Sequence, residues 1–230
     1  MKNYLAWLKE EIKSLNTTGA VMLAFMTGAQ LMFYLLNEIT VLSTVTLLAT
    51  LLGSACTVYM MIGKPINGVL GLLSAIGFIY VNWTAGHYAS VLDQLVFVTL
   101  IDIPLIVTWK NWGHRIENGV KHLSVAGWSA TFALMMAAWA VTFIIYQHIG
   151  DTNPMWDALT LIIGATASVY VFRGYGDSYS LWLMADFVNI ALWFTAFTDG
   201  YSASALPMLL TMAFYLMTAL YGRFKSVWSK

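Results

Sequence analysis

Four side chains in the stretch SLWLMADFVNIALWF, residues 180–194, could bind a solute inside an otherwise apolar segment. Their spacings of four, three and four residues place them on one face of a helix. They are Trp182, Asp186, Asn189 and Trp193. A central aspartate costs roughly 2.5–3.5 kcal/mol on membrane-insertion scales, so this face must contact protein or a water-filled cavity. Hydrogen bonds that only tie helices together would explain one such residue, but two aromatic rings around two polar groups favour a binding site.

This face has the chemistry to hold a flat, cationic, hydroxylated solute. Aromatic rings attract a positively charged ring by about 0.5–2 kcal/mol. The amide of Asn189 can donate to and accept from a hydroxyl or carboxamide group. The carboxylate of Asp186 can accept hydrogen bonds from two ribose hydroxyls or offset a positive charge.

The composition indicates which elements carry this face. Of the 230 residues, 60% are hydrophobic and only 10% are charged, and the mean hydropathy is +0.72. A soluble domain of this length would need a more polar surface, so the sequence predicts an all-α polytopic membrane protein with eight transmembrane helices. A formal net charge of zero and the lack of a basic stripe argue against a nucleic-acid partner. The eight apolar stretches, each about long enough to cross a bilayer, are residues 19–36, 41–62, 66–84, 88–108, 124–147, 155–172, 180–198 and 203–222.

The distribution of basic residues gives an independent view of this topology. Residues 1–18 predict an amphipathic helix at the membrane interface rather than a span. With eight spans, both termini and the even-numbered loops share one side, and that side holds all eleven basic residues. The opposite loops hold only Glu38, Asp151 and Asp199, so we expect both termini in the cytoplasm. The basic residues are Lys2, Lys9, Lys13, Lys64, Lys110, Arg115, Lys121, Arg173, Arg223, Lys225 and Lys230.

Two parts of the chain resemble each other at an offset of 114 residues. GHYASVL at 86–92 aligns with GYSASAL at 200–206, and the same offset pairs Ser54 with Ser168. Two parallel three-helix repeats are a transporter arrangement, in which the substrate site lies near mid-membrane between the repeats. The predicted units are an extra helix at 19–36, a first repeat at 41–109, a linker helix at 124–148 and a second repeat at 155–223.

Further polar residues lie in the third and fourth predicted spans. Gln94 is a second candidate ligand for the solute. Asp93 and Asp102 are nine residues apart, so in a regular helix they do not share a face, and each fits a tie between helices as well as a ligand. Other residues could line the same cavity, but belts of tyrosine and tryptophan are normal at membrane interfaces, and we favour a structural role for this group. They are Asn67, Asn82, Tyr59, Tyr170 and Tyr215. The four histidines lack metal-ligand spacing, so we expect no metal and no cofactor.

Two blocks of residues resemble the bacterial nicotinamide riboside transporters, the vitamin B3 carriers of the Pnu family. The first block comprises Asn67, Gly71, Phe78, Tyr88-Ala89-Ser90 and Gln94. The second comprises Pro154-x-Trp156-Asp157, Arg173 and residues that match part of a family motif of the form W-x2-W-x3-N before a Gly-x2-Ala turn, here at Gly200 and Ala203. Asn189 takes the motif asparagine and Trp182 its first tryptophan. Ala185 stands where the second tryptophan is expected, and Asp186 adds an acid beside it.

The resemblance implies a three-plus-one-plus-three core like that of SWEET sugar carriers, assembled as a homotrimer in the bacterial inner membrane. It also implies facilitated diffusion of nicotinamide riboside by alternating access, with trapping by a cytoplasmic kinase and no ion coupling. Because the second motif tryptophan is missing, thiamine, which is also a flat cation, or another vitamin is an alternative substrate. The residues expected to hold the solute are Trp182, Asn189, Gln94, Asp186, Trp193, Asn67 and Tyr88.

Two other classes of protein fit parts of the sequence. GYGD at 174–177 matches the G-x-G-D pattern of intramembrane aspartyl proteases. Asp177 falls in a predicted cytoplasmic loop, however, and that chemistry requires two facing carboxylates at membrane depth, so we do not expect an enzyme. A purely structural membrane subunit is the other alternative, and a ligand would not stabilise it.

Overall fold

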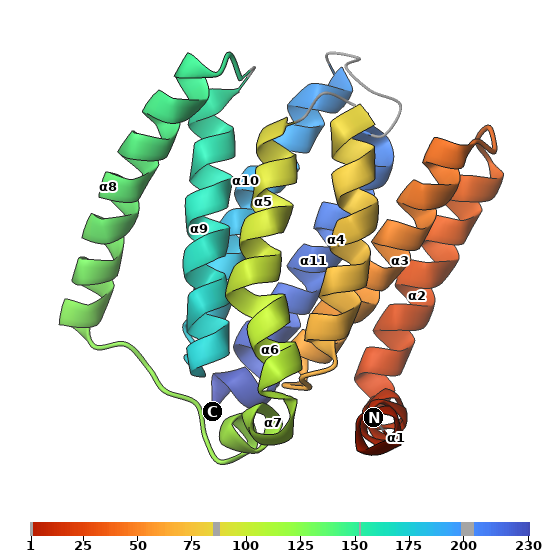
Figure 1. Ribbon diagram of the computed structural model, residues 1–230, viewed down its shortest axis with the longest axis vertical. Helices are drawn as coiled ribbons and strands as arrows, with labels where there is room; N and C mark the ends of the chain where they lie inside the picture. The colour runs from red at the N-terminus through yellow and green to blue at the C-terminus, as the bar shows by residue number, and fades with distance from the viewer. Residues whose placement is uncertain (1, 85–87, 152, 199–204) are drawn as a thin grey trace.

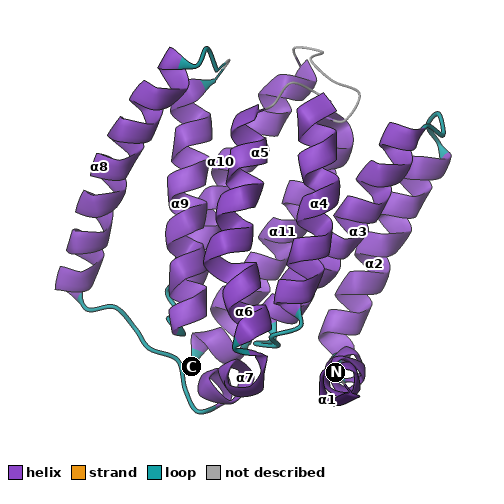
Figure 2. Cartoon of the chain, in the orientation of Figure 1, coloured by secondary structure: helices purple, strands orange, loops and turns teal. Residues whose placement is uncertain are grey.

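The computed structural model describes residues 2–84, 88–151, 153–198 and 205–230, and helices make up most of these ranges (Figure 2). Gly86, Asp199, Gly200 and Ala203, which the sequence comparison used, lie outside the described residues. The elements are α1 (Lys2–Lys13), α2 (Thr17–Leu35), α3 (Val41–Met61), α4 (Asn67–Thr84), α5 (Tyr88–Phe97), the π-helical turn η1 (Val98–Asp102), α6 (Ile103–Val107), α7 (Trp109–Glu117), α8 (Val125–His148), α9 (Pro154–Arg173), α10 (Ser178–Thr198), α11 (Ala205–Lys225) and the 3-10 turn η2 (Val227–Ser229).

Each of the eight predicted apolar stretches coincides with one helix or one continuous run of helices. The fourth stretch is the run α5–η1–α6, and the others are α2, α3, α4, α8, α9, α10 and α11. The all-α architecture predicted from the sequence is therefore confirmed. Within the described residues, the helices long and apolar enough to cross a membrane are Thr17–Leu35, Val41–Met61, Tyr88–Val107, Val125–His148 and Pro154–Arg173.

Short polar residues and glycine fix several helix ends. The side-chain oxygen of Asn16 accepts a hydrogen bond from the Gly19 N–H at 2.7 Å and begins α2. Thr40 and Ser43 form a reciprocal capping box at the start of α3. Helix α9 ends at Gly174, whose φ of +78° is the left-handed conformation that favours glycine. These local signals set where the long helices start and stop.

Within the described residues, six helical segments contact one another in a closed ring: α3, α4, α5–η1, α9, α10 and α11. Helix α4 packs between α3 and α5, and α10 packs between α9 and α11. The two sets meet where α3 contacts α11 and where α5 and η1 contact α9. Helix α2 packs on the outside of α3, and α8 packs on α9. Both chain termini lie at the same end of the molecule, close to α7 (Figure 1).

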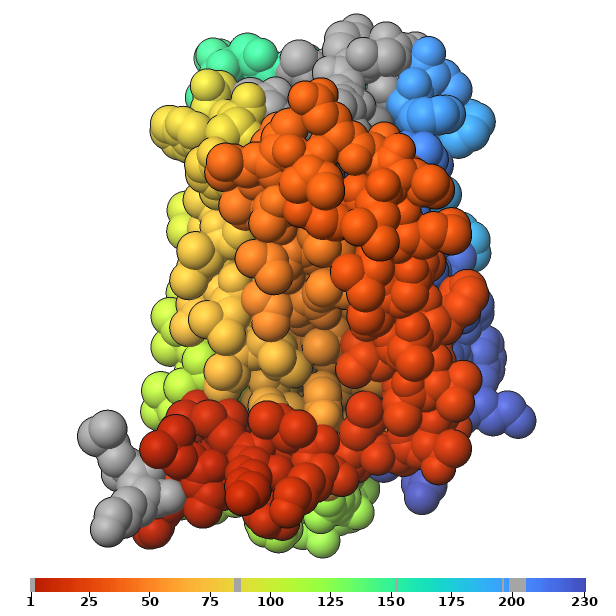
Figure 3. All heavy atoms as spheres, turned by 90° about the vertical axis from the view of Figure 1, so that its right-hand side faces the viewer, coloured from red at the N-terminus to blue at the C-terminus, as the bar shows by residue number. Residues whose placement is uncertain are grey.

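Helix α1 lies across the end of the molecule that carries the termini (Figure 3). The Tyr59 hydroxyl, near the end of α3, donates a hydrogen bond to the Ile12 carbonyl at 2.8 Å. Burial raises the pKa of the Glu11 carboxyl, and the nearby charge of Lys64 opposes this rise. Helix α1 is therefore fixed to the ring by its own contacts, as an interfacial helix would be.

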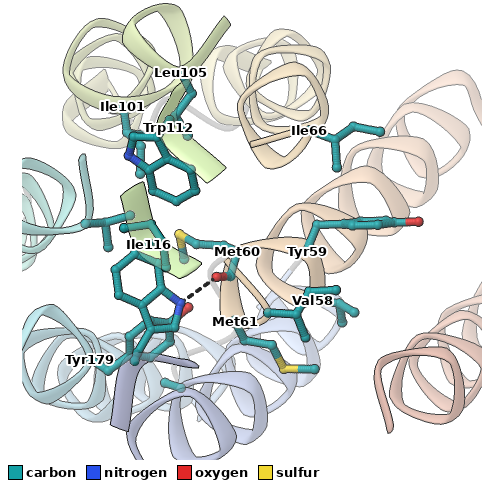
Figure 4. Close-up of a cluster of buried hydrophobic side chains, with 14 of the residues drawn as sticks. Val58, Tyr59, Met60, Met61, Ile66, Ile101, Leu105, Trp112, Ile116 and Tyr179 are labelled. Carbon is teal, nitrogen blue, oxygen red and sulfur yellow. Dashed lines mark hydrogen bonds between the residues drawn. The ribbon is translucent and has the colours of Figure 1, made fainter. Parts of the chain in front are cut away.

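A cluster of large buried side chains fills the ring near this same end (Figure 4). Trp228 is 0% exposed, and its indole N–H donates to the Met60 carbonyl at 2.8 Å, the dashed line in Figure 4. The indole N–H of Trp112 donates to the Phe172 carbonyl at 3.0 Å. The Tyr179 ring lies 5.5 Å from that of Trp228. The cluster thus joins the ends of α3 and α9 and the start of α10 to α7 and η2.

Trp228→Ala is expected to lower the free energy of unfolding by about 3–5 kcal/mol, because it removes a fully buried ring and leaves a cavity. Unfolding of the purified protein in mixed micelles with a rising fraction of SDS measures this change. Trp83→Ala is the matched control, since the Trp83 ring is 62% exposed. An equal loss of stability in the two variants would contradict the role assigned to Trp228.

Candidate solute-binding cavity

A cavity of about 200 Å³ lies inside the helix ring. Both helix sets contribute to its wall. The first set contributes α3, α4 and the α5–η1 run, and the second contributes α9, α10 and α11. The cavity therefore lies where the sequence predicts a transporter site, between the two sets of helices. Its polar and aromatic lining residues include Thr57, Asn67, Ser74, Phe78, Asn82, Ser90, Asp93, Gln94, Phe97, Asp102, Thr160, Ser168, Tyr179, Trp182, Asp186, Asn189, Trp193, Tyr215 and Thr218.

All four residues predicted to share a face of α10 line this cavity. The centroid of the Trp182 ring lies 6.0 Å from that of Phe97, which lines the cavity from α5. The side-chain N–H of Asn189 donates to the Ala185 carbonyl at 3.0 Å, which orients the amide and leaves its oxygen for a solute. Trp193 packs in a buried apolar cluster at one side of the cavity. Helix α10 thus presents one face with aromatic and polar groups in register.

Two of the remaining three expected residues also line the cavity. Gln94 does so from α5 and Asn67 from α4, where its side-chain N–H donates to the Lys64 carbonyl at 2.6 Å. Tyr88 is not among the lining residues. It is 58% exposed and packs edge-on against Trp83, with ring centroids 5.3 Å apart. The physical reason is that six residues separate it from Gln94, about 240° around a helix, so the two side chains point in different directions.

The prediction that Asp93 and Asp102 do not share a helix face is compatible with both of them lining a cavity that the helices surround. Both residues line the cavity. In the π-helical turn η1 the Ile103 N–H donates to the Val98 carbonyl, five residues back. A wider turn of this kind changes the rotation along a helix. The carboxyl group of Asp102 packs against Gly71 of α4, where an added Cβ would clash with it.

Several buried polar atoms of the cavity wall have no hydrogen-bond partner among the described residues. Buried polar groups are nearly always hydrogen-bonded, and an unsatisfied one costs about 1–3 kcal/mol. These atoms are therefore available to a polar solute or to water inside the cavity. They are the Asn67 Oδ1, the Asp93 Oδ1, the Ser168 Oγ, the Tyr179 hydroxyl and the Trp182 Nε1.

The cavity carries acidic groups without basic ones. Asp93, Asp102 and Asp186 line it, and no lysine, arginine or histidine does so within the described parts of the chain. A cavity with this lining favours a cation over an anion. The three carboxyl groups come from two facing walls, α5–η1 on one side and α10 on the other.

Some lining residues were not identified from the sequence. Tyr179 stands three residues before Trp182, so the helical period that found the α10 face could have included it. Ser168 was visible only as a member of the repeat alignment. Of the weaker candidates, Asn82 and Tyr215 line the cavity. Tyr59 and Tyr170 do not, because the first hydroxyl bonds to Ile12 and the second to Thr131.

The GYGD segment lies outside the cavity. The Asp177 Oδ2 accepts a hydrogen bond from the Leu123 N–H at 2.7 Å and lies 3.3 Å from the His122 Nδ1. These contacts tie the loop before α8 to the start of α10. Asp177 is not one of the cavity carboxyl groups, so it does not supply half of an aspartyl protease pair.

Comparison with known proteins gives one family. The chain is 27% identical over 226 residues to the nicotinamide riboside transporter PnuC of Neisseria mucosa, covering 95% of this chain and 84% of that protein. It is 24% identical over 195 residues to the nicotinamide riboside transporter PnuC of Haemophilus influenzae, covering 82% of this chain and 80% of that protein. The crystal structure of the vitamin B3 transporter PnuC is similar with a TM-score of 0.81 and 25% identity, over 98% of this chain and 96% of that chain.

These relatives are transporters, which confirms the prediction of a membrane transporter rather than an enzyme. Residues 43–230, which include every helix of the ring except the first residues of α3, match the family described as nicotinamide mononucleotide transporter. The match covers most of the chain and the whole lining of the cavity. The chain therefore belongs to the nicotinamide mononucleotide transporter family.

Proposed function

We propose that this protein carries nicotinamide riboside across the bacterial inner membrane by facilitated diffusion. The observation that carries the proposal is the cavity between the two helix sets, which combines aromatic rings, unpartnered polar atoms and carboxyl groups without a basic side chain. Nicotinamide riboside is a flat cation with ribose hydroxyls and a carboxamide, so its chemistry complements this lining. The names of both sequence relatives support the same solute.

Each part of the solute has a complementary group on the wall. The aromatic rings of Trp182 and Trp193 attract the cationic pyridinium ring, and Asp186 offsets its charge. Asn189 and Gln94 exchange hydrogen bonds with the ribose hydroxyls and the carboxamide. The unpartnered Oδ1 of Asn67 adds an acceptor. Tyr88, which lies outside the cavity, is not part of the proposed site.

The charges on the cavity wall favour nicotinamide riboside over nicotinamide mononucleotide, the two solutes that the comparisons name. The family description names the mononucleotide, whereas both relatives are named for the riboside. The mononucleotide carries an additional phosphate with a charge of about −1.5 to −2 near neutral pH. No basic side chain among the described lining residues could pair with that charge, so burying the phosphate in this cavity is unfavourable. We therefore infer that the riboside is the solute.

The proposed transport mechanism uses the two helix sets as two repeats. The α3–α4–α5 set and the α9–α10–α11 set follow the same order in the chain, with α8 between them and α2 outside. This order supports the proposed 3+1+3 core plus one helix. Rocking of one repeat against the other would expose the cavity to each side in turn. Eight crossings would put both termini in the cytoplasm, where basic residues gather.

The resemblance to the Pnu family adds two features to this proposal. We propose that the protein assembles as a homotrimer and that a cytoplasmic kinase traps the imported solute by phosphorylation. Thiamine is the alternative solute, because it is also a flat cation and because Ala185 replaces the second motif tryptophan.

Uptake of radiolabelled nicotinamide riboside into proteoliposomes tests the proposal. Asn189→Ala is expected to lower the initial rate by at least about tenfold, because it removes hydrogen bonds that are worth about 1–3 kcal/mol in a buried site. Asp177→Asn is the matched control and is expected to keep the wild-type rate, since Asp177 lies outside the cavity. Uptake of thiamine without nicotinamide riboside would support the alternative solute, and uptake of neither would contradict a vitamin carrier.

A further inference from the structure

Asp186 is a buried acid on the wall of the cavity. It is 5% exposed, and none of the described residues that line the cavity with it is basic. An ionised carboxylate at membrane depth is costly unless a cation or several donors compensate it. The described wall offers donors such as the Tyr179 hydroxyl and the Trp182 N–H but no cation, so a proton on Asp186 would remove the cost of an uncompensated charge.

The other acids of the cavity strengthen this conclusion. Asp102 is also 5% exposed, and Asp93 lines the same cavity of about 200 Å³ with an unpartnered Oδ1. Carboxyl groups that share a small site cannot all be ionised, because each negative charge disfavours the next. A monovalent cationic solute would neutralise one charge only. The charge balance of the loaded cavity is therefore one carboxylate and two carboxylic acids.

The remaining groups that face Asp186 do not supply a counter-charge. Tyr179 on its own helix and Tyr215 on α11 are the phenols of the cavity wall, and neither can supply a positive charge. Helix α3 contributes the Cys56 thiol. The α4 wall contributes amides and a serine hydroxyl as its polar groups, and the α9 wall contributes hydroxyls. Apart from Asp186, the carboxyl groups among the described lining residues are Asp93 and Asp102 of the α5–η1 run.

We propose that Asp186 carries a proton in the empty cavity and that the cationic solute replaces this proton when it binds. The exchange is balanced: the Asp186 carboxylic acid and the riboside cation give an ion pair between carboxylate and pyridinium, and one proton leaves to water. The proposal rests on the proposed function and goes beyond it, because facilitated diffusion alone requires no proton. It makes the pH on each side of the membrane a regulator of solute binding.

The position of Asp186 assigns the exchange to this acid rather than to its neighbours. It lies on the α10 face between Trp182 and Asn189, where the cationic ring is expected to bind. Asp102 lies on the facing wall, in the π-helical turn and packed against Gly71. The ion pair therefore forms at Asp186, and the acids of the other wall keep their protons.

The direction of the pH dependence follows from this exchange. A higher pH removes the proton from Asp186 and favours the form that binds the cation. The dissociation constant should therefore fall by about tenfold per pH unit, as expected for the release of one proton. Uptake should slow as the medium outside becomes acidic, because protons compete with the solute at the outward-facing site.

Titration calorimetry of the full-length protein with nicotinamide riboside tests the proposal. At about pH 7 the binding enthalpy is measured in phosphate and in Tris, whose ionisation enthalpies differ, and the slope against ionisation enthalpy gives the protons released. We expect about one proton for the wild type. Asp186→Asn should bind more weakly, release no proton and show no pH dependence. Asp177→Asn, the same substitution outside the cavity, should release one proton like the wild type.

The outcomes separate this proposal from the proposed function. Binding of the riboside without proton release overturns the exchange and leaves the carrier function standing. Absence of binding at every pH overturns both. Asp93→Asn and Asp102→Asn test the assignment even if Asp186→Asn fails to fold, since each should still release one proton. Loss of release in either of these two variants, or its persistence in Asp186→Asn, overturns the assignment to Asp186.

Discussion

Adding a 5′-phosphate to nicotinamide riboside is expected to weaken its binding to this protein by at least about a thousandfold. The phosphate would enter a cavity whose described lining holds Asp93, Asp102 and Asp186 and no basic side chain. Burying an unpaired anion costs several kcal/mol, and about 4 kcal/mol corresponds to a factor of a thousand in affinity. Competition between unlabelled nicotinamide mononucleotide and bound radiolabelled riboside measures the difference.

This experiment also decides between the two solute names that the comparisons give. The riboside itself is the control competitor and should displace the label at concentrations near its own dissociation constant. Displacement by the mononucleotide at similar concentrations would contradict the proposed charge selectivity. It would then favour the solute named in the family description.

Gly164→Ala is expected to weaken riboside binding by at least about tenfold without unfolding the protein. Gly164 lies on α9, where an added Cβ would be 2.7 Å from the Phe97 Cζ and 3.8 Å from the Trp182 Cζ3. The Phe97 ring must then move against Trp182 and alter the wall on which the cationic ring binds. Overpacking of this kind costs about 1–3 kcal/mol, and about 1.4 kcal/mol is a tenfold change. Calorimetric titration measures the effect.

A matched glycine provides the control for this prediction. An added Cβ at Gly28 on α2 has no atom within 4 Å, so Gly28→Ala should bind as the wild type does. It should also raise stability by about 0.5–1 kcal/mol through its helix propensity. Gly164→Ala combined with Phe97→Leu should recover part of the affinity, because the smaller side chain makes room for the new methyl group. Unchanged binding in Gly164→Ala alone would show that this wall does not shape the site.

The α10 face could be predicted from the sequence because one regular helix carries it. The positions of Trp182, Asp186, Asn189 and Trp193 follow the helical period, and the structure keeps that period across Ser178–Thr198. A central acid in an apolar segment also indicates a functional site, since the membrane disfavours it elsewhere. The helix boundaries were predicted for a similar reason, because the length of an apolar run reflects the thickness of the bilayer.

That both acids of the α5–η1 run line one cavity could not be predicted, because it depends on how the other helices pack around this run. Asp93 lies in α5 and Asp102 in the π-helical turn η1, and both line the cavity. Tyr88 was included through a resemblance of spacing, yet its position around α5 points it away from the cavity. The burial of Trp228 depends on contacts with Met60 and Tyr179, which are remote in sequence. Such long-range packing leaves no periodic signal in the chain.

The most direct test of the central claim is a titration of the purified protein with nicotinamide riboside, with Trp182→Ala and Trp83→Ala compared side by side. Both variants lose one tryptophan, but only Trp182 lines the cavity. The proposed site predicts that the wild type binds one riboside per chain. Trp182→Ala should bind it at least about tenfold more weakly, because it loses about 0.5–2 kcal/mol of cation–π attraction together with ring contact. Trp83→Ala should bind it with unchanged affinity. No heat from the wild type, or equal affinity in the two variants, would contradict a solute site in this cavity.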